Sequence, residues 1–589
     1  MIPRYKKRTH TCGQLRPADI GKTVTLTGWV DVRRDLGGVV FIDLRDRYGI
    51  TQVVFSPQHS RQAYDTAQVL RSEYVVSITG TVEKRPAGTE NQDIATGALD
   101  VAGTELTILN KSETPPFPIK DEIDVSEDVR LRYRYLDLRR PGVQKNLLIR
   151  HKAGHIVRSY FDRLGFAEIE TPVLMKSTPE GARDFLVPSR IHRGKFYALP
   201  QSPQTYKQIL MVAGFDRYVQ IVKCFRDEDF RADRQPEFTQ IDVEMSFVDE
   251  EDIMNVTEGL MTELFKEVLG VDLKAPFRRL SYREAMERYG SDKPDTRFGL
   301  ELKDCSSDVA GSGFRVFSET VSKGGVVAGF VVPGLGAITR NQLDGLTDLA
   351  KSNGAAGLIS IKVLDGQFES SVDKFVSQME LNTISGRLGA KQGDLCLLIS
   401  GPWQKAYSVL GALRMEMAVR QQLINQKHWD FLWVVDFPLL EFSEEEQRHI
   451  AVHHPFTSPK PEDISLLSSK PLQAKARAYD LVLNGREIAG GSIRIHDSEL
   501  QGTMFQLLGI GPEEAKQKFG FLLDAFRFGA PPHGGIAFGL DRIIMLMAGQ
   551  KSIRDVIAFP KTASAVSLMD DAPSSVDKRQ LDELHLRIV

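Results

Sequence analysis

Apolar and polar residues alternate along the stretch 238–248. Its odd positions from 241 onward are apolar (Ile241, Val243, Met245, Phe247), and its even positions from 240 are polar (Gln240, Asp242, Glu244, Ser246). A period of two predicts a strand with one buried face and one polar face. An apolar run at 219–225 precedes a dense group of charges. We therefore expect two antiparallel strands joined by a loop that carries Arg226, Glu228, Arg231 and Arg234.

The charges of this loop favour a phosphate site. Arginine presents a planar fork that pairs with phosphate oxygens, and a carboxylate among arginines can hold a metal or an amine. A solvated hairpin is the alternative, because runs of mixed charge are usually exposed.

Short alternating stretches near the start of the chain predict five further strands. They are 24–30, 39–45, 49–55, 75–82 and 106–109, with a helical stretch at 61–70 after the third. This order suits a small closed barrel of the OB type. Another small barrel without a ligand fits the same pattern.

The remaining patterns divide the chain further. Pro115-Pro-Phe-Pro118 is typical of a linker, and apolar residues at helical spacing predict a helix over 143–164. Between them, 130–140 holds five arginines and two tyrosines, which fit either contacts to a phosphate backbone or an amphipathic hinge helix. We expect an α+β multidomain protein: a barrel (1–110), a hinge (111–140), a core domain in two parts (141–289 and 426–560), an inserted α+β module (290–425) and a C-terminal extension (561–589).

Composition limits the classes of function. The chain is 42% hydrophobic and 26% charged with a net charge of −3, so a nucleic-acid site has to be a local patch. The four cysteines form no CxxC pair, which argues against zinc and against a disulfide framework. No apolar run reaches the ~18 residues of a membrane span. We expect a cytoplasmic protein that does not associate with membranes.

Two late segments carry further candidate chemistry. In the glycine-rich segment 529–547, Asp541 and Arg542 interrupt an apolar helix, where they form either a structural ion pair or a nucleotide contact. In the strand 484–496, Ser492, Arg494 and His496 share one face, and Glu487 has the opposite parity. A bulge at Gly490-Gly491 would bring Glu487 and Arg494 into one cleft.

Three shorter segments complete the candidates. Ser177–Phe185 has the composition of a mobile loop, with Glu180 at its tip. The helix start at 201–211 carries Gln204 and Lys207. His453-His454 lacks the partners of a metal site.

Taken in this order, the motifs resemble those of bacterial-type aspartyl-tRNA synthetases, which are class II aminoacyl-tRNA synthetases with an N-terminal OB domain. The segment ending in Thr171-Pro172 is similar to motif 1, which forms the homodimer; 225–242 is similar to motif 2, and 539–542 to motif 3. The likeness covers essentially the whole chain. It implies an antiparallel catalytic sheet flanked by helices, together with the barrel and the insert.

The resemblance also implies roles for individual residues. Arg226 would hold the α-phosphate of ATP, Arg542 the γ-phosphate, and Glu487 a Mg²⁺ ion between phosphates. The catalytic set is Arg226, Glu228 and Arg542, and the full ATP set adds Asp227, Gln235, Glu487, Gly539, Leu540 and Asp541. The implied substrates are ATP, L-aspartate and aspartate tRNA.

The choice of amino acid can be argued physically. An aspartate side chain is an anion and needs fixed cations, which Arg494 and Lys207 supply, and His453 adds a donor. Glu180, Gln204 and Asp242 would accept from the ammonium group. A neutral asparagine amide would leave two cations unpaired, and lysine would need carboxylates instead.

The barrel would read the anticodon. Phe41 resembles the family's stacking aromatic and Gln52 its hydrogen-bonding partner, with Arg33 and Arg34 on phosphates; Phe41 could equally be barrel core. In the family that the chain resembles, a leucine at the position of Leu36 accompanies enzymes that charge only aspartate tRNA, so the resemblance favours that specificity. The alternatives are a relaxed enzyme that also charges asparagine tRNA, a sibling synthetase for asparagine or lysine, and a non-catalytic RNA-binding paralogue.

Overall fold

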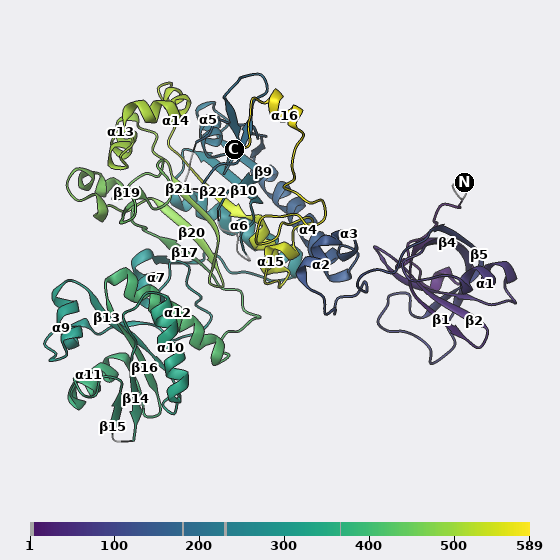
Figure 1. Ribbon diagram of the computed structural model, residues 1–589, viewed down its shortest axis with the longest axis horizontal. Coiled ribbons are helices and arrows are strands. Elements are labelled where there is room, and N and C mark those ends of the chain that lie inside the picture. Colours follow the sequence, from purple (N-terminus) through teal and green to yellow (C-terminus); the bar gives the residue numbers. More distant parts are fainter. Residues whose placement is uncertain (1–4, 179–181, 229–232, 366) are drawn as a thin grey trace. The chain divides into compact units, whose positions relative to one another are not determined.

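The chain folds into two compact units, one of which contains the N-terminal barrel. The computed structural model describes residues 5–178, 182–228, 233–365 and 367–589 (Figure 1). The first unit comprises Met1–Arg150 and Arg554–Ser575, and the second comprises His151–Ile553 and Val576–Val589. A segment near the C-terminus therefore belongs to the same unit as the barrel.

The N-terminal strands close into a barrel in the order β1-β2-β3-β5-β4. Its elements are β1 (Thr23–Leu36), β2 (Val39–Asp46), β3 (Gly49–Phe55), α1 (Arg61–Gln68), β4 (Val75–Lys84) and β5 (Leu99–Asn110), after a short 3-10 turn η1 (Pro17–Asp19). Every second residue of a strand points into the barrel, and on β2 these residues, Val40, Ile42 and Leu44, are fully buried. The five predicted strands and the helix are confirmed, although the last strand begins at Leu99.

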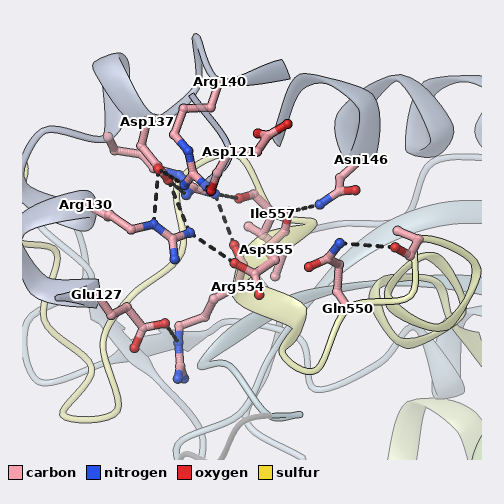
Figure 2. A network of polar contacts seen from close by, with 12 residues as sticks. Asp121, Glu127, Arg130, Asp137, Arg140, Asn146, Gln550, Arg554, Asp555 and Ile557 are labelled. Atoms are coloured by element: carbon pink, nitrogen blue, oxygen red, sulfur yellow. Dashed lines mark hydrogen bonds and ion pairs between the residues drawn. The ribbon is translucent and has the colours of Figure 1, made fainter. Parts of the chain in front are cut away.

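An ionic network ties the hinge to the segment after residue 553 within the first unit (Figure 2). The hinge contains α2 (Glu127–Arg132) and α3 (Arg134–Asp137), and it leads into α4 (Pro141–Arg163). The fully buried Asp137 accepts from Arg140 at 2.6 Å, from Arg130 at 3.1 Å and from Arg134. Arg134 also donates to the backbone carbonyls of 554, 557 and 558. These arginines serve the protein's own packing rather than a phosphate backbone.

The second unit is built on an eight-stranded sheet in the order β11-β17-β20-β21-β22-β10-β9-β6. Its strands are β6 (Ala167–Glu168), β9 (Arg217–Phe225), β10 (Glu237–Ser246), β11 (Arg278–Ser281), β17 (Phe431–Val435), β20 (Ala478–Leu483), β21 (Arg486–Ile493) and β22 (His533–Gly539). The central pairs are antiparallel, and only the edge pairs β6/β9 and β11/β17 are parallel.

Helices and small hairpins surround this sheet. The helices are α4, α5 (Gln204–Val212), α6 (Glu250–Leu269), α7 (Tyr282–Tyr289), α13 (Ser498–Leu507), α14 (Pro512–Phe526), α15 (Leu540–Met547) and α16 (Lys578–Glu583). The 3-10 turns η2 (Pro461–Ser468), η3 (Pro471–Gln473) and η4 (Ile553–Asp555) lie outside the sheet, as do the hairpins β7 (Leu186–Pro188) with β8 (Phe196–Ala198) and β18 (Leu440–Ser443) with β19 (Arg448–Ala451). Among the helices of the described ranges, none is both long and apolar enough to cross a membrane.

The hairpin β9–β10 forms as predicted, with two corrections. Both faces of β10 are buried, because its polar face lies against other polar side chains instead of solvent. Phe247, predicted to be buried in the strand, is 71% exposed and adopts a positive φ of 57°. The strand ends at Ser246, so the alternation extends one residue beyond the sheet.

The bulge predicted in the strand 484–496 exists, but at another residue. Neighbours Leu481 and Val482 of β20 pair with Ala489 and Glu487 of β21, so Ile488 is the extra residue. The prediction of a bulge at Gly490-Gly491 was therefore wrong in position. The register change itself is present and brings Glu487 into phase with Gly490, Ser492 and Arg494.

The inserted module is α+β, as predicted. Its five strands run in the order β12-β13-β16-β14-β15: β12 (Lys303–Asp304), β13 (Val326–Val332), β14 (Ile359–Leu364), β15 (Gln367–Ser370) and β16 (Leu395–Gly401). The helices are α8 (Ser306–Val309), α9 (Arg315–Ser322), α10 (Arg340–Ser352), α11 (Gln378–Leu388) and α12 (Trp403–Arg420). Alternating residues of β13 and β16 enter two separate apolar clusters, so both faces of this sheet are covered.

Candidate functional site

Two cavities lie against the central strands of the catalytic sheet. The first, of about 220 Å³, is lined by the hairpin loop, β21, β22 and the start of α15. The second, of about 400 Å³, is lined by α5, β10, β20, β21 and the His453-His454 segment. Arg226, Gln240, Glu487 and Ala537 line both cavities, so the two spaces meet at these residues.

A buried ionic cluster forms the floor of the second cavity. Lys207 Nζ lies 2.7 Å from Asp242 and 3.2 Å from Glu244, and Arg494 donates two hydrogen bonds to Glu244 at 2.9 and 3.0 Å. All four side chains are at most 2% exposed. Two cations therefore face two anions, and the cluster is close to electrically neutral.

The pKa values of the cluster follow from its packing. Burial opposes the charged form of Glu244, but Arg494 and Lys207 outweigh it and lower the pKa of this carboxyl to about 2. Burial raises the pKa of Asp242. Glu244 is thus the fixed anion that holds Arg494 in place.

The two adjacent histidines have opposite environments. Burial disfavours the charged form of His453, but Asp480, at 3.3 Å from Nε2, raises its pKa above the ordinary value of 6.5. His454 is buried beside Arg494, and both effects lower its pKa far below that value. Arg494 Nη1 donates to His454 Nε2 at 2.6 Å. His453 can carry a charge in the cavity, whereas His454 stays neutral and accepts.

The first cavity has the chemistry of a nucleotide site. Its apolar lining comes from Phe238, Ile488, Ala489 and Ala537, and its charged lining from the two loop arginines, Glu228, Asp233, Glu487, Asp541 and Arg542. The guanidinium of Arg226 stacks over the ring of Phe238 at 5.0 Å, which fixes its plane. Nε of Arg542 is buried without a hydrogen-bond partner among the residues the structure describes. An unsatisfied buried donor of this kind suits an anionic ligand.

Most of the predicted nucleotide residues line this cavity. Of the ATP set, Arg226, Glu228, Gln235, Glu487, Gly539, Asp541 and Arg542 do so. Leu540 is buried and Asp227 lies near Arg183, at 3.6 Å, so neither lines either cavity. Asp541 also accepts from the backbone N–H of Thr239 at 2.7 Å and thereby anchors α15 to β10.

The predicted amino-acid residues converge on the second cavity. Gln204, Lys207, Asp242, His453 and Arg494 all line it. Glu180 lies outside the described residues, as does Arg231 of the hairpin loop. Asp242, predicted to accept from a ligand ammonium group, is here the partner of Lys207.

Sequence reasoning missed Glu244, His454 and Asp480. Glu244 follows Asp242 by two residues on β10, so the alternation already placed both on one face. Asp480 lies on β20 directly opposite Gly490, a pairing that only the sheet register reveals. The role of His454 depends on the position of Arg494, which the sequence leaves open.

The chemistry of Glu487 and Asp480 fits a divalent cation held with a phosphate ligand. A Cβ atom added to Gly490 would lie 2.7 Å from Asp480 Oδ1 and 3.6 Å from Glu487 Oε1, so both carboxylates border the same glycine. Burial and the neighbouring Asp480 raise the pKa of Glu487. Mg²⁺ is commonly held by one or two carboxylates together with phosphates. No group of three or more His, Cys, Asp or Glu side chains suited to a metal occurs among the described residues.

Three of the predicted anticodon residues, Arg34, Phe41 and Gln52, share one face of the barrel strands, whereas Arg33 pairs with the core residue Ile42 and has the opposite parity. Arg34 pairs with Phe41 across β1 and β2, and Gln52 faces Asp43 across β2 and β3. Arg34 donates to Asp43 and to Gln52, both at 2.9 Å. Phe41 is only partly buried, unlike its neighbours Val40 and Ile42, so it is not part of the barrel core. Arg33 lies 3.5 Å from Asp35, and Leu36 is 63% exposed.

Comparison with known proteins agrees with this architecture. Residues 126–563 match the model of class II tRNA synthetases (D, K and N), and residues 24–114 match that of the OB-fold nucleic acid binding domain. The asparaginyl-tRNA synthetase of Pyrococcus horikoshii, solved with asparaginyl-adenylate, aligns with a TM-score of 0.59 and 19% identity over 94% of this chain and 98% of its own. A putative aspartyl-tRNA synthetase from Leishmania major aligns with the same score and identity, over 95% and 94% of the two chains. These structures share the fold.

Closer relatives match along nearly the whole length. The Aspartate--tRNA(Asp/Asn) ligase of Caldanaerobacter subterraneus subsp. tengcongensis is 58% identical over 99% of this chain and 98% of its own. That of Moorella thermoacetica is 57% identical over 98% and 96%. The barrel and the sheet with its paired cavities are thus those of an aminoacyl-tRNA synthetase, an enzyme of the ligase class. The chain belongs to the class II tRNA synthetase family (D, K and N).

Proposed function

We propose that this protein is an aspartate–tRNA ligase. The main support is the buried cluster that contains Lys207 and Arg494. This cluster lies in the second cavity, which shares Arg226 with the first, nucleotide-like cavity. The relatives that match nearly the whole chain carry this activity in their names. Aspartate would place its side-chain carboxylate toward Lys207 and Arg494, and its α-carboxylate toward Arg226.

The charge balance of the cluster explains the choice of amino acid. Because Asp242 and Glu244 already neutralise Lys207 and Arg494, the additional positive charge has to come from another group. His453, whose pKa Asp480 raises, supplies it. An aspartate carboxylate gains from that charge, whereas an asparagine amide gains less. A lysine side chain would be repelled.

The reaction proceeds in two steps. An oxygen of the α-carboxylate of aspartate attacks the α-phosphorus of ATP, the bond between that phosphorus and the oxygen that bridges to the β-phosphate breaks, and pyrophosphate leaves with the electron pair. The oxygen of the terminal ribose hydroxyl of tRNA then attacks the carbonyl carbon, the bond between that carbon and the phosphate oxygen breaks, and AMP leaves with the electron pair while its phosphate takes up the hydroxyl proton. Arg226 and Arg542 stabilise charge on the phosphates, and positioning accounts for the remaining rate enhancement. Mg²⁺, which Glu487 and Asp480 would hold with ATP, neutralises phosphate charge.

The experiment is ATP–pyrophosphate exchange with the purified full chain in the presence of aspartate, asparagine or lysine. We expect exchange with aspartate alone. Exchange supported by asparagine or lysine instead would overturn the assignment of the cluster. Lys207→Met should raise the KM for aspartate far more than the KM for ATP, and equal effects on both would count against the cluster as the side-chain site.

Two observations differ on whether the enzyme charges aspartate tRNA alone or asparagine tRNA as well. Leu36, exposed on the barrel, was expected to accompany charging of aspartate tRNA alone. The relatives are named for both aspartate and asparagine tRNAs, which favours the relaxed alternative. Charging purified aspartate and asparagine tRNAs side by side distinguishes them. Plateau charging of both tRNAs would contradict the expectation from Leu36.

We also propose that the enzyme works as a homodimer in the cytoplasm. The segment after motif 1 and the hairpin β7–β8 expose Val173, Leu174, Leu186 and Phe196, each at least 45% accessible. Exposed apolar side chains grouped in this way are typical of subunit interfaces. Light scattering on the purified chain should give the mass of two copies. The four cysteines are free, which suits a reducing compartment.

A further inference from the structure

A third and larger cavity adjoins the nucleotide cavity. It measures about 780 Å³ and lies within the second unit. Its walls come from the start of the insert (Lys293), from α12 (Met415), from the start of β21 (Arg486), and from the residues that follow α15 (Lys551). It shares Asp233, Arg234, Glu487 and Arg542 with the nucleotide cavity. All four shared residues are charged, so the passage between the cavities is polar.

Positive charge exceeds negative charge on these walls. The lining contains six cations (Arg234, Lys293, Arg297, Arg486, Arg542 and Lys551) and three acids (Asp233, Asp295 and Glu487). Arg297 is satisfied by Asp295 through two hydrogen bonds, at 2.9 and 2.7 Å. Without this pair, the lining still contains five cations and two acids. An anionic ligand would balance this excess of positive charge.

Arg234 donates to Glu228 at 3.1 Å, and the other four cations are loosely paired. Arg486 and Arg542 share one oxygen of Asp233 at 3.9 and 3.6 Å, distances longer than a hydrogen bond. Lys293 lies 3.5 Å from its neighbour Asp292. Lys551 forms no ion pair with any residue the structure describes. Several donors are therefore available to an anion that carries many oxygens.

We propose that this cavity receives inorganic pyrophosphate, the leaving group of adenylate formation. The inference rests on the proposed function, because that reaction generates the ligand. After the bond to the α-phosphorus breaks, the adenylate still fills the nucleotide and amino-acid cavities. Pyrophosphate then has a direct path past Arg542 and Arg234 into the cationic cavity, where Lys293, Arg486 and Lys551 hold it before release.

The test measures pyrophosphate in the reverse reaction. Enzyme carrying aspartyl-adenylate is mixed with increasing magnesium pyrophosphate, and ATP formation is followed for the full chain and for Arg486→Met and Lys551→Met. Each variant should raise the KM for pyrophosphate about five- to tenfold, since each removes one charge-assisted contact. The KM for ATP in the forward reaction should change less than twofold. Lys351→Met, an exposed lysine of α10 in the insert, serves as the matched control.

Two outcomes would overturn the inference. Equal increases in the KM for ATP and for pyrophosphate would make these residues part of the ATP site itself. An unchanged KM for pyrophosphate in both variants would show that the cavity does not hold it.

A direct titration separates this inference from the proposed function. Magnesium pyrophosphate is titrated calorimetrically into the full chain, with and without a stable aspartyl-adenylate analogue. If the analogue fails to bind but pyrophosphate binds more weakly to Lys551→Met than to the unmodified chain, the proposed function fails and the anion site stands. If the analogue binds and pyrophosphate affinity is the same in every variant, the site fails and the function stands.

Discussion

At the scale of single residues, the candidate site is organised by buried charge pairs. Glu244 fixes Arg494, Asp242 fixes Lys207, and Asp480 raises the pKa of His453. Asp242 and Asp480 line the amino-acid cavity beside the cations that they hold, and Glu244 holds Arg494 from behind the lining. Substitution of one partner leaves the other charge buried and unpaired, which costs more than the pair contributes.

Arg226 should be essential for adenylate formation because it lines both cavities where the reacting atoms meet. We expect Arg226→Ala to lower aspartate-dependent ATP–pyrophosphate exchange at least about 10²- to 10³-fold, the usual effect of removing one donor that stabilises charge in the transition state. Arg190→Ala, at an exposed loop arginine, is the control and should retain full exchange. Near-normal exchange in Arg226→Ala would remove this residue from the ATP site.

His453 should make aspartate binding depend on pH. Because Asp480 raises its pKa, His453 is protonated below that pKa and loses its charge as the pH rises through it. Aspartate affinity should therefore fall over the same interval. In Asp480→Asn the pKa of His453 drops, and the fall in affinity should begin at a lower pH.

Calorimetric titration of aspartate without ATP, repeated across pH values for the unmodified chain and for Asp480→Asn, checks this. Leaving ATP out separates the effect on His453 from any effect on Mg²⁺ binding. Superimposable profiles for the two proteins would exclude His453 as the titrating group.

At the scale of elements, the site depends on close packing of β21 against β22. A Cβ atom at Gly491 would lie 2.1 Å from the carbonyl oxygen of Gly535 and 2.8 Å from the ring of Tyr479. The bulge at Ile488 shifts the register upstream of this contact and turns Glu487 toward the site. Within a few residues, β21 therefore contains both a register change and a close approach of its backbone to that of β22.

Gly491→Ala should therefore destabilise the protein by about 1–3 kcal/mol, the usual cost of overpacking, because the nearest obstructing atom is the backbone carbonyl oxygen of Gly535. Gly386→Ala in α11 is the matched control, since no atom lies within 4 Å of its added methyl group. There we expect a small gain in stability, as alanine favours a helix. Urea unfolding of both variants measures the difference, and equal midpoints would contradict the packing argument.

At the scale of the whole molecule, the proposed function assigns tRNA recognition to the barrel and adenylate chemistry to the second unit. The barrel has its own closed sheet and core, and the two reaction cavities are lined entirely by residues of the second unit. The proposed chemistry with ATP and aspartate would therefore use side chains of the second unit alone.

Phe41→Ala and Gln52→Ala should weaken tRNA charging while leaving ATP–pyrophosphate exchange within twofold. Stacking on a base contributes about 1–3 kcal/mol, so kcat/KM for tRNA should fall roughly five- to hundredfold. Tyr48→Ala, at another exposed aromatic of the barrel, is the control. Loss of exchange in Phe41→Ala would assign this residue a structural role instead.

The sequence alone determined the order of elements and most of the candidate residues, because alternation, helical spacing and charge are local properties. Such patterns predicted the hairpin β9–β10, the five barrel strands and the insert, and they singled out Lys207, Arg226 and Arg494 as candidates. The roles expected of these three residues came from the resemblance to a known family. Tertiary structure decided which charges pair, and pairing depends on register across strands far apart in the chain. Four features arise from contacts between segments that no local pattern brings together. They are the burial of both faces of β10, the bulge at Ile488, the exposure of Phe247 and the ion pair between Glu244 and Arg494.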